Sequence, residues 1–139
     1  MSDMKHQQIT DQIIKAFYKV YNTLGYGFLE KVYENALDIE LTEMDFKVER
    51  QKRILVHYKN HVVGDFGSDL IVDNLVICEL KANEILVSDN EFQLINYLKA
   101  TDIEVGLLLN FGKKPERIRR KIYDNEKKEW HTTRITPLQ

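Results

Sequence analysis

The 139-residue sequence has little of several features that define other protein classes. Its single cysteine, Cys78, cannot form an internal disulfide, so a disulfide-stapled secreted domain is excluded. No apolar run approaches the ~20 residues that span a bilayer, and the polar N-terminus lacks the apolar stretch of a signal peptide. Two prolines and six glycines leave no visible linker. These absences predict one self-folding, cytoplasmic domain over residues 1–139.

An excess of charge of one sign is also missing, because 20 basic side chains stand against 22 acidic ones. This balance argues against a general DNA-coating protein. The distribution is uneven: residues 1–110 carry 11 basic and 18 acidic groups, whereas residues 111–130 carry 8 and 4. Taken alone, this pattern favours chance clustering on a solvated surface over an anionic partner held near carboxylates.

Three stretches show the three- and four-residue spacing of apolar side chains that is typical of amphipathic helices. They cover residues 11–24, about 28–44 and about 89–100. The glycines of Gly25-Tyr26-Gly27 separate the first two helices. Ser88-Asp-Asn-Glu91 has the form of a capping box and begins the third. The inner face of that helix is predicted to carry Phe92, Ile95 and Leu98.

Between the second and third helices the apolar period changes to two and β-formers prevail. The predicted strands are residues 48–58, 62–66, 68–72 and 75–81, and Gly67 is one of the short breaks that make them antiparallel neighbours. The apolar run Val105–Phe111 predicts a buried strand that pairs parallel after the helix crossover. Residues 117–123 alternate as a last strand. The predicted fold class is α/β (α+β), a central mixed β-sheet flanked by helices.

Charged residues interrupt the strongly apolar segment from Asp69 to Lys81. Glu79 and Lys81 stand two residues apart on one strand, so both point to the same face, while Cys78 points into the core. Asp69 on the preceding strand can reach the same pocket. Two carboxylates with oxygen ligands only suit a hard divalent ion such as Mg²⁺ or Mn²⁺. An ammonium beside them can orient an attacking water and stabilise charge at a scissile phosphate.

A metal site at Asp69 and Glu79 requires a particular loop length in the hairpin that joins the two strands. A two-residue turn at Asp73-Asn74 would place Asp69 opposite Cys78 and turn its carboxylate to the wrong face. We therefore predict an odd-length loop or a bulge, which puts Asp69 on the face of Glu79. The Asp73-Asn74 pair is not the Asn-Gly or Asp-Gly sequence that favours the tightest hairpin, so a longer loop is compatible with it.

Three motifs carry a resemblance to a known family. Asp69 followed by Glu79-Leu-Lys81 resembles the signature of the PD-(D/E)xK nuclease superfamily. Gly27-Phe-Leu-Glu30-Lys-Val-Tyr33 is similar to the motif that names the GxxExxY protein family, a small prokaryotic branch of that superfamily. Gln93-Leu-Ile-Asn-Tyr97 is similar to the QxxxY motif of RecB-type nucleases. The resemblance covers roughly residues 10–112 and implies a restriction-endonuclease-like core.

The resemblance implies catalytic roles for four residues. Asp69 and Glu79 would ligate the metal, and Lys81 would act on the attacking water. Glu30, from the second helix, would join the metal shell directly or through water. Taken alone, Glu30 is instead an ordinary first-turn glutamate that favours the helix dipole.

The same resemblance implies contacts with the substrate. Gln93 and Tyr97 stand four residues apart on one helix face, so both can meet the substrate backbone. Tyr33 is open between packing and substrate binding. Ser68 and Asn90 depart from the family pattern, in which a proline and a histidine are expected, and these departures bear on phosphate contacts and substrate choice.

The leading hypothesis is a Mg²⁺- or Mn²⁺-dependent nuclease that hydrolyses phosphodiester bonds of nucleic acid, DNA rather than RNA, by metal-activated water. The basic residues near the C-terminus would hold the phosphate backbone by counterion release. They are Arg117, Arg119 and Lys121, with Lys113 and Lys114.

Two alternatives remain open at this point. The chain could be a catalytically inactive module that keeps the nuclease fold to bind nucleic acid or a protein partner, since fold does not imply function. It could also be a homodimer in which Val105–Phe111 or exposed aromatic residues build the interface.

Overall fold

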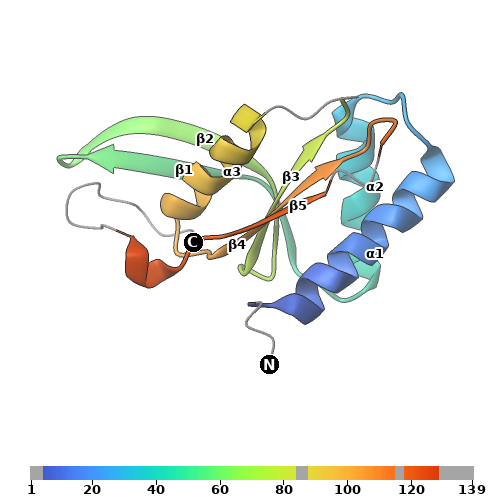
Figure 1. The fold of residues 1–139 in the computed structure, drawn as a ribbon, viewed down its shortest axis with the longest axis horizontal. Coiled ribbons are helices and arrows are strands. Elements are labelled where there is room, and N and C mark those ends of the chain that lie inside the picture. Colours follow the sequence, from blue (N-terminus) through green and yellow to red (C-terminus); the bar gives the residue numbers. More distant parts are fainter. Residues whose placement is uncertain (1–4, 84–87, 115–117, 129–139) are drawn as a thin grey trace.

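The computed structural model describes residues 5–83, 88–114 and 118–128, which form a five-stranded sheet with three helices (Figure 1). The elements follow one another as α1 (Gln7–Leu24), α2 (Glu30–Glu43), β1 (Val48–Tyr58), β2 (His61–Val72), β3 (Val76–Lys81), α3 (Ser88–Lys99), β4 (Val105–Asn110) and β5 (Arg119–Ile122), with a 3₁₀ turn at Asn125–Lys127. None of the helices in these ranges has the length and apolar character of a membrane span.

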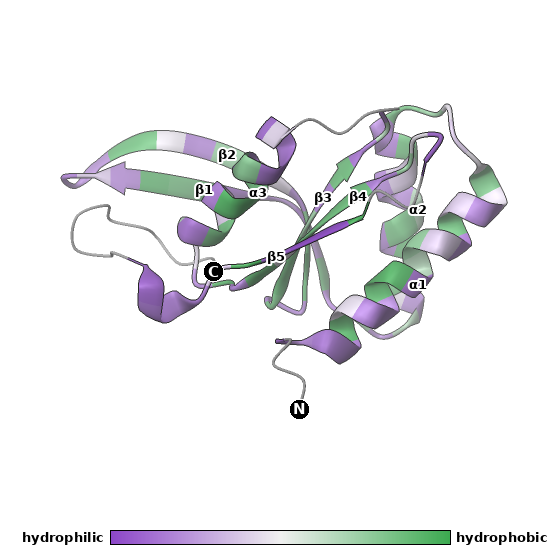
Figure 2. Cartoon of the chain, in the orientation of Figure 1, coloured by the Kyte–Doolittle hydropathy of each residue, from purple (hydrophilic) through white to green (hydrophobic). Residues whose placement is uncertain are grey.

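The strands lie in the order β1-β2-β3-β4-β5, and β3 and β4 are the parallel pair. The other neighbours are antiparallel, so the sheet is mixed, as predicted. Figure 2 shows hydrophobic residues along β3 and β4 and a hydrophilic β5. The predicted fold class is confirmed.

Two apolar clusters cover the two faces of the sheet. Leu70 and Cys78 pack with the helices α1 and α2, whereas their chain neighbours Ile71 and Ile77 pack with α3. Alternate residues of a strand point to opposite faces, so a buried strand needs apolar residues on both sides. Leu94 of α3 lies above Gly106, where an added Cβ would come within 2.7 Å of its side chain.

Two expectations about the strands are wrong. β2 runs without a break through Gly67, which pairs with Arg53. A Cβ there would come within 2.9 Å of the Gln51 side chain, so this glycine permits a close approach and does not end a strand. The run Val105–Phe111 does not offer a dimer interface either, because all of β4 is buried between β3 and β5.

The predicted inner face of α3 is also partly wrong. Phe92 is 60% exposed and Ile95 is half-buried, although Leu98 is buried as expected. Leu94, Tyr97 and Leu98 make the contact with the sheet. The buried face of α3 is rotated from the predicted one by about one residue. The reason is tertiary packing, because Leu94 fits against the sheet at Gly106.

Tyr33 fixes the turn between α1 and α2. Its side chain is fully buried and stacks on Phe111, with ring centroids 4.4 Å apart. The hydroxyl donates to the carbonyl of Gly25 at 2.6 Å and accepts from the N–H of Phe28 at 3.2 Å. Gly25 and Gly27 both have positive φ, at 71° and 108°, which a side chain would strain. Tyr33 therefore has a structural role, and we leave it out of the substrate contacts.

Replacing Tyr33 by Phe is expected to lower the free energy of unfolding by about 1–2 kcal/mol, because it leaves two backbone groups of the turn without their buried partner. Urea denaturation measures the loss. Tyr58→Phe is the control, since Tyr58 is 52% exposed and its variant should unfold like the parent. Equal stability of both variants would contradict the assigned role.

Candidate active site

The hairpin between β2 and β3 has the odd-length loop that the metal-site interpretation requires. Val72 pairs with Val76, so Asp73-Asn74-Leu75 forms the loop. Asp73 and Asn74 have φ values of 52° and 56°, a left-handed conformation that these two residue types tolerate best after glycine. Leu70 then pairs with Cys78, and Asp69 comes to lie opposite Glu79. This prediction is confirmed.

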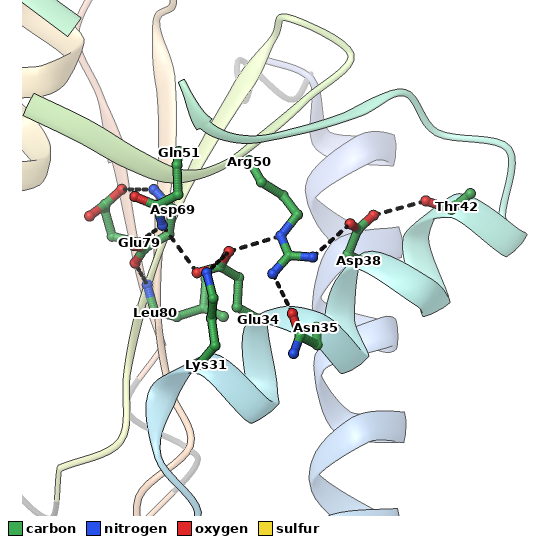
Figure 3. Close-up of polar contacts among 10 residues, drawn as sticks. All are labelled: Lys31, Glu34, Asn35, Asp38, Thr42, Arg50, Gln51, Asp69, Glu79 and Leu80. Atoms are coloured by element: carbon green, nitrogen blue, oxygen red, sulfur yellow. Dashed lines mark hydrogen bonds and ion pairs between the residues drawn. The ribbon is translucent and has the colours of Figure 1, made fainter. Parts of the chain in front are cut away.

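Asp69 and Glu79 each bind the backbone of the other's strand (Figure 3). The N–H of Asp69 donates to Glu79 Oε2 at 2.9 Å, and the N–H of Leu80 donates to Asp69 Oδ2 at 2.8 Å. The regular β2–β3 pairing ends one residue earlier, at Leu70 and Cys78. Where the ladder stops, the two carboxylates therefore accept the hydrogen bonds of these backbone N–H groups. These bonds fix the position of both side chains.

Glu79 is buried and Asp69 is half-buried, which penalises the negative charge of the pair. Burial is the main cause that raises the pKa of Glu79 to about 8, and the neighbouring Asp69 raises it further. The pKa of Asp69 is raised as well, mainly by burial. Lys81 lowers the pKa of both carboxyls, so its ammonium lies close to them, as the strand spacing predicts. Within the described ranges neither carboxylate forms an ion pair with Lys or Arg.

A second set of polar residues supports Asp69 from α2 and β1, and sequence reasoning missed this set. Gln51 donates to Glu34 at 3.1 Å and to Asp69 at 3.4 Å (Figure 3). Arg50 donates to the other oxygen of Glu34 at 2.9 Å and pairs with Asp38 at 3.5 Å. Glu34 is only 5% exposed, so these partners balance a buried charge.

The sequence contains a signal for Glu34 but none for Gln51. Glu34 follows Glu30 by four residues and therefore shares its helix face. Gln51 has a φ of 51° and is skipped in the β1–β2 ladder, which lets its side chain reach Asp69. A left-handed residue inside a strand is not visible in an alternating pattern.

Glu30 lies at the start of α2 and is exposed. Its charge raises the pKa of Glu79, so it faces the carboxylate pair without a hydrogen bond to it. Among the described residues no group of three or more acidic, histidine or cysteine side chains is close enough together to hold a metal ion. The structure therefore brings Asp69, Glu79 and Lys81 together and leaves Glu30 at the margin.

Gln93 and Tyr97 of α3 form a hydrogen-bonded pair next to this centre. Gln93 Nε2 donates to the Tyr97 hydroxyl at 3.0 Å. Burial, followed by the charge of Glu79, raises the pKa of Tyr97 to about 12. Asp69 contributes to the same shift, so the charges of both carboxylates act on Tyr97.

A sequence model of the PD-(D/E)XK nuclease superfamily matches residues 7–122, which is most of the chain. The chain belongs to this superfamily. The match includes the carboxylate pair, Lys81 and the α3 residues that adjoin them. No curated protein and no solved structure gives a significant match. Membership of the PD-(D/E)XK superfamily indicates a nuclease, and so implies binding of nucleic acid.

PD-(D/E)XK nucleases generally use divalent metals, and the residues present fit such an ion. Asp69 and Glu79 offer hard oxygen ligands from two strands. Burial is the main cause that raises both pKa values, and neighbouring carboxylates add to it, so the charged form of the pair is disfavoured in the metal-free protein. A divalent cation supplies the missing positive charge, and Mg²⁺ is commonly held by one or two carboxylates with water completing its shell.

The described basic residues near the C-terminus make their contacts with other residues than the carboxylate pair. Arg119 and Lys121 of β5 share one face and both pair with Glu91 of α3, at 3.6 and 2.6 Å. Lys113 lies over the ring of Tyr26, 5.6 Å from its centroid, and Lys114 is exposed. Arg117 lies outside the described residues.

Proposed function

We propose that this chain is a Mg²⁺- or Mn²⁺-dependent nuclease that hydrolyses phosphodiester bonds of DNA, with Asp69, Glu79 and Lys81 at its reactive centre. The observation that carries the proposal is the pair of facing carboxylates, the buried Glu79 and the half-buried Asp69, fixed by reciprocal bonds to the backbone N–H groups of Leu80 and Asp69. Such fixed positions provide the preorganisation that catalysis of a charge-forming reaction requires.

Asp69 and Glu79 hold the ion in this proposal. The bound ion supplies Lewis-acid activation of water and phosphate. Lys81 orients the attacking water and offsets the negative charge that develops on the phosphate, which its place beside both carboxylates allows. Gln51 and Glu34 are positioning residues, because they act on Asp69 through hydrogen bonds. Glu30 contributes through water or charge from the margin of the site.

Contacts with the substrate come from two sides. Gln93 and Tyr97 reach the sugar-phosphate backbone from α3, which is the role of the QxxxY motif. Arg119 and Lys121 bind phosphates further along the strand, where the shared Glu91 holds them side by side. The exposed residues Lys113 and Lys114 extend this contact, and Arg117, outside the described residues, is assigned to it from the sequence alone.

The proposal includes membership of the GxxExxY branch, which is prokaryotic and cytoplasmic. Its name-giving positions are Gly27, Glu30 and Tyr33. Gly27 has a positive φ. Glu30 is the first residue of α2, and its charge acts on Glu79. The Tyr33 hydroxyl donates to the carbonyl of Gly25 and so closes the turn between α1 and α2. Each of the three positions thus has a physical reason in this fold.

End-labelled DNA and RNA, single- and double-stranded, incubated with the protein and Mn²⁺ test the proposal. Cleavage of DNA that disappears in an Asp69→Asn variant supports it. A chain that binds nucleic acid but neither binds Mn²⁺ nor cleaves any substrate is the inactive module instead, and the proposal then fails.

Lys81→Met is expected to lower the cleavage rate by about a hundredfold or more while leaving Mn²⁺ binding intact, because the ammonium acts on the reacting groups and does not ligate the ion. Glu79→Gln should lose both. Isothermal titration with Mn²⁺ and single-turnover cleavage measure the two properties. Lys52→Met is the control, since Lys52 pairs with Glu49 on β1. Normal cleavage by Lys81→Met would remove Lys81 from the mechanism.

A further inference from the structure

A groove with a volume of about 740 Å³ lies between α3 and the outer part of the β1–β2 hairpin. The hairpin lines it with Val56, Val63 and Phe66, and α3 lines it with Phe92, Gln93 and Asn96. In Figure 1 this part of the hairpin extends past the rest of the sheet, with α3 beside it. None of these six lining residues takes part in the hydrogen bonds that hold Asp69 and Glu79 in place.

Two phenylalanine rings in the groove are exposed to solvent. Phe92 is 60% exposed, and Phe66 is 43% exposed. The Phe66 ring lies against Gly64, where an added Cβ would come within 2.7 Å of Cε2, so the missing side chain leaves room for this ring. Large aromatic side chains that stay exposed in a concave site mark a binding surface.

The charge of the groove is balanced. Asp89 and Lys99 lie on its α3 wall, and the remaining α3 groups are rings, amides and Ala100. The amides of Gln93 and Asn96 offer both donors and acceptors. Flat apolar faces combined with amide groups suit a neutral planar ring with a hydrogen-bonding edge, and a nucleobase has this chemistry. A phosphate would meet no excess of positive charge here.

Tyr97 connects the groove with the proposed reactive centre, because it lines the groove and the charge of Glu79 acts on its hydroxyl. Phe66 contacts Tyr97, with ring centroids 5.7 Å apart, and Tyr97 also lines the groove. Gln93 lines the groove and donates to the Tyr97 hydroxyl. Asp69 and Glu79 point to the same face of the sheet as Ile71 and Ile77, which is the face that α3 covers, so the groove and the carboxylate pair lie on one side of the sheet.

We infer that this groove binds an unpaired nucleobase of the substrate strand, stacked on Phe92 and Phe66, so that the chain acts on single-stranded DNA or frayed ends. The inference rests on the proposed nuclease function. A base inside a duplex has both faces stacked and its pairing edge occupied, so it cannot enter the groove. The groove thus selects single-stranded DNA next to the phosphodiester bond that is cleaved.

Stacking is tested in the Asp69→Asn background, where bound DNA is not cleaved. The probe is a short single-stranded oligonucleotide that carries a fluorescent adenine analogue quenched by stacking. We expect quenching on binding, and about tenfold weaker binding after Phe92→Ala, as for the loss of one base–aromatic stack. Phe92→Tyr should restore both. Tyr18→Ala is the matched control, because Tyr18 is an exposed aromatic residue on α1.

Several results would overturn the inference. Equal affinity for single-stranded and duplex DNA, unchanged binding after Phe92→Ala, or no oligonucleotide binding at all would each do so. A groove that instead joins two copies would show as a dimer in sedimentation that Phe92→Ala dissociates. Cleavage by the unmodified chain without any dependence on Phe92 leaves the proposed function standing and removes the base site. Phe92-dependent stacking by a chain that cleaves nothing leaves the base site standing and removes the proposed function.

Discussion

Asp69→Asn is expected to reduce DNA cleavage by about three orders of magnitude without unfolding the chain. The loss follows because one of the two carboxylates that hold the ion becomes neutral, and such electrostatic stabilisation supplies several kcal/mol to phosphoryl chemistry. The fold survives because an amide oxygen can still accept the hydrogen bond from the N–H of Leu80. Removing one of two buried like charges should even raise the melting temperature of the metal-free protein.

Asp65→Asn is the matched control for this variant. Asp65 lies on the same strand, four residues earlier, and its carboxylate is exposed and bound to Arg53. Arg53 lowers the pKa of Asp65, the opposite direction from Asp69. We expect Asp65→Asn to cleave like the parent. Single-turnover assays and thermal unfolding of both variants decide the matter, and full activity of Asp69→Asn would exclude the proposed centre.

The metal-free chain is expected to lose stability as the pH rises from 4.5 to about 8. Glu79 has a folded pKa of about 8 against an ordinary value of 4.5, so within this window the folded state binds more protons than the unfolded state. Stability falls with pH wherever the folded state binds more protons. The contribution of Glu79 is therefore complete below pH 4.5 and is lost through the window. The total is on the order of a few kcal/mol.

Urea denaturation at several pH values measures this slope, and Glu79→Gln should flatten it. Glu104→Gln is the control, because hydrogen bonding to the N–H of Asn125 lowers the pKa of Glu104. Its stabilisation is lost only as the pH falls below the ordinary value, so the Glu104 variant should keep the slope. Mn²⁺ should stabilise the parent increasingly with pH, since binding releases protons. A parent whose stability rises through the window contradicts this account of the carboxylate pair.

The secondary structure and the carboxylate hairpin could be predicted from sequence because both depend on local patterns. The two-residue period of Val48–Tyr58 gave the bounds of β1 correctly. We predicted the odd-length loop because the metal-site interpretation needs Asp69 and Glu79 on one face, and the observed pairing of Leu70 with Cys78 meets this need.

The support of the site and its groove could not be predicted in this way. Gln51 reaches both Glu34 and Asp69 only because it adopts a left-handed conformation between two ladder pairs. The helical period of α3 allowed Phe92 on the inner face, yet the fit of Leu94 over Gly106 turned that ring outward. Neither outcome follows from periodicity, because each depends on how elements distant in the chain come together.

The sequence by itself therefore determined which charged residues share one face of the β2–β3 hairpin, and the tertiary structure decided how they are held and how far they are buried. Asp69, Glu79 and Lys81 follow from a short alternating segment and one loop length. The raised pKa of Glu79 and the exposed ring of Phe92 depend on burial, and burial depends on what other elements cover. A pattern of residue types indicates on which face of its own strand or helix a side chain lies. Only packing between α2, α3 and the sheet sets how much water and charge surround it.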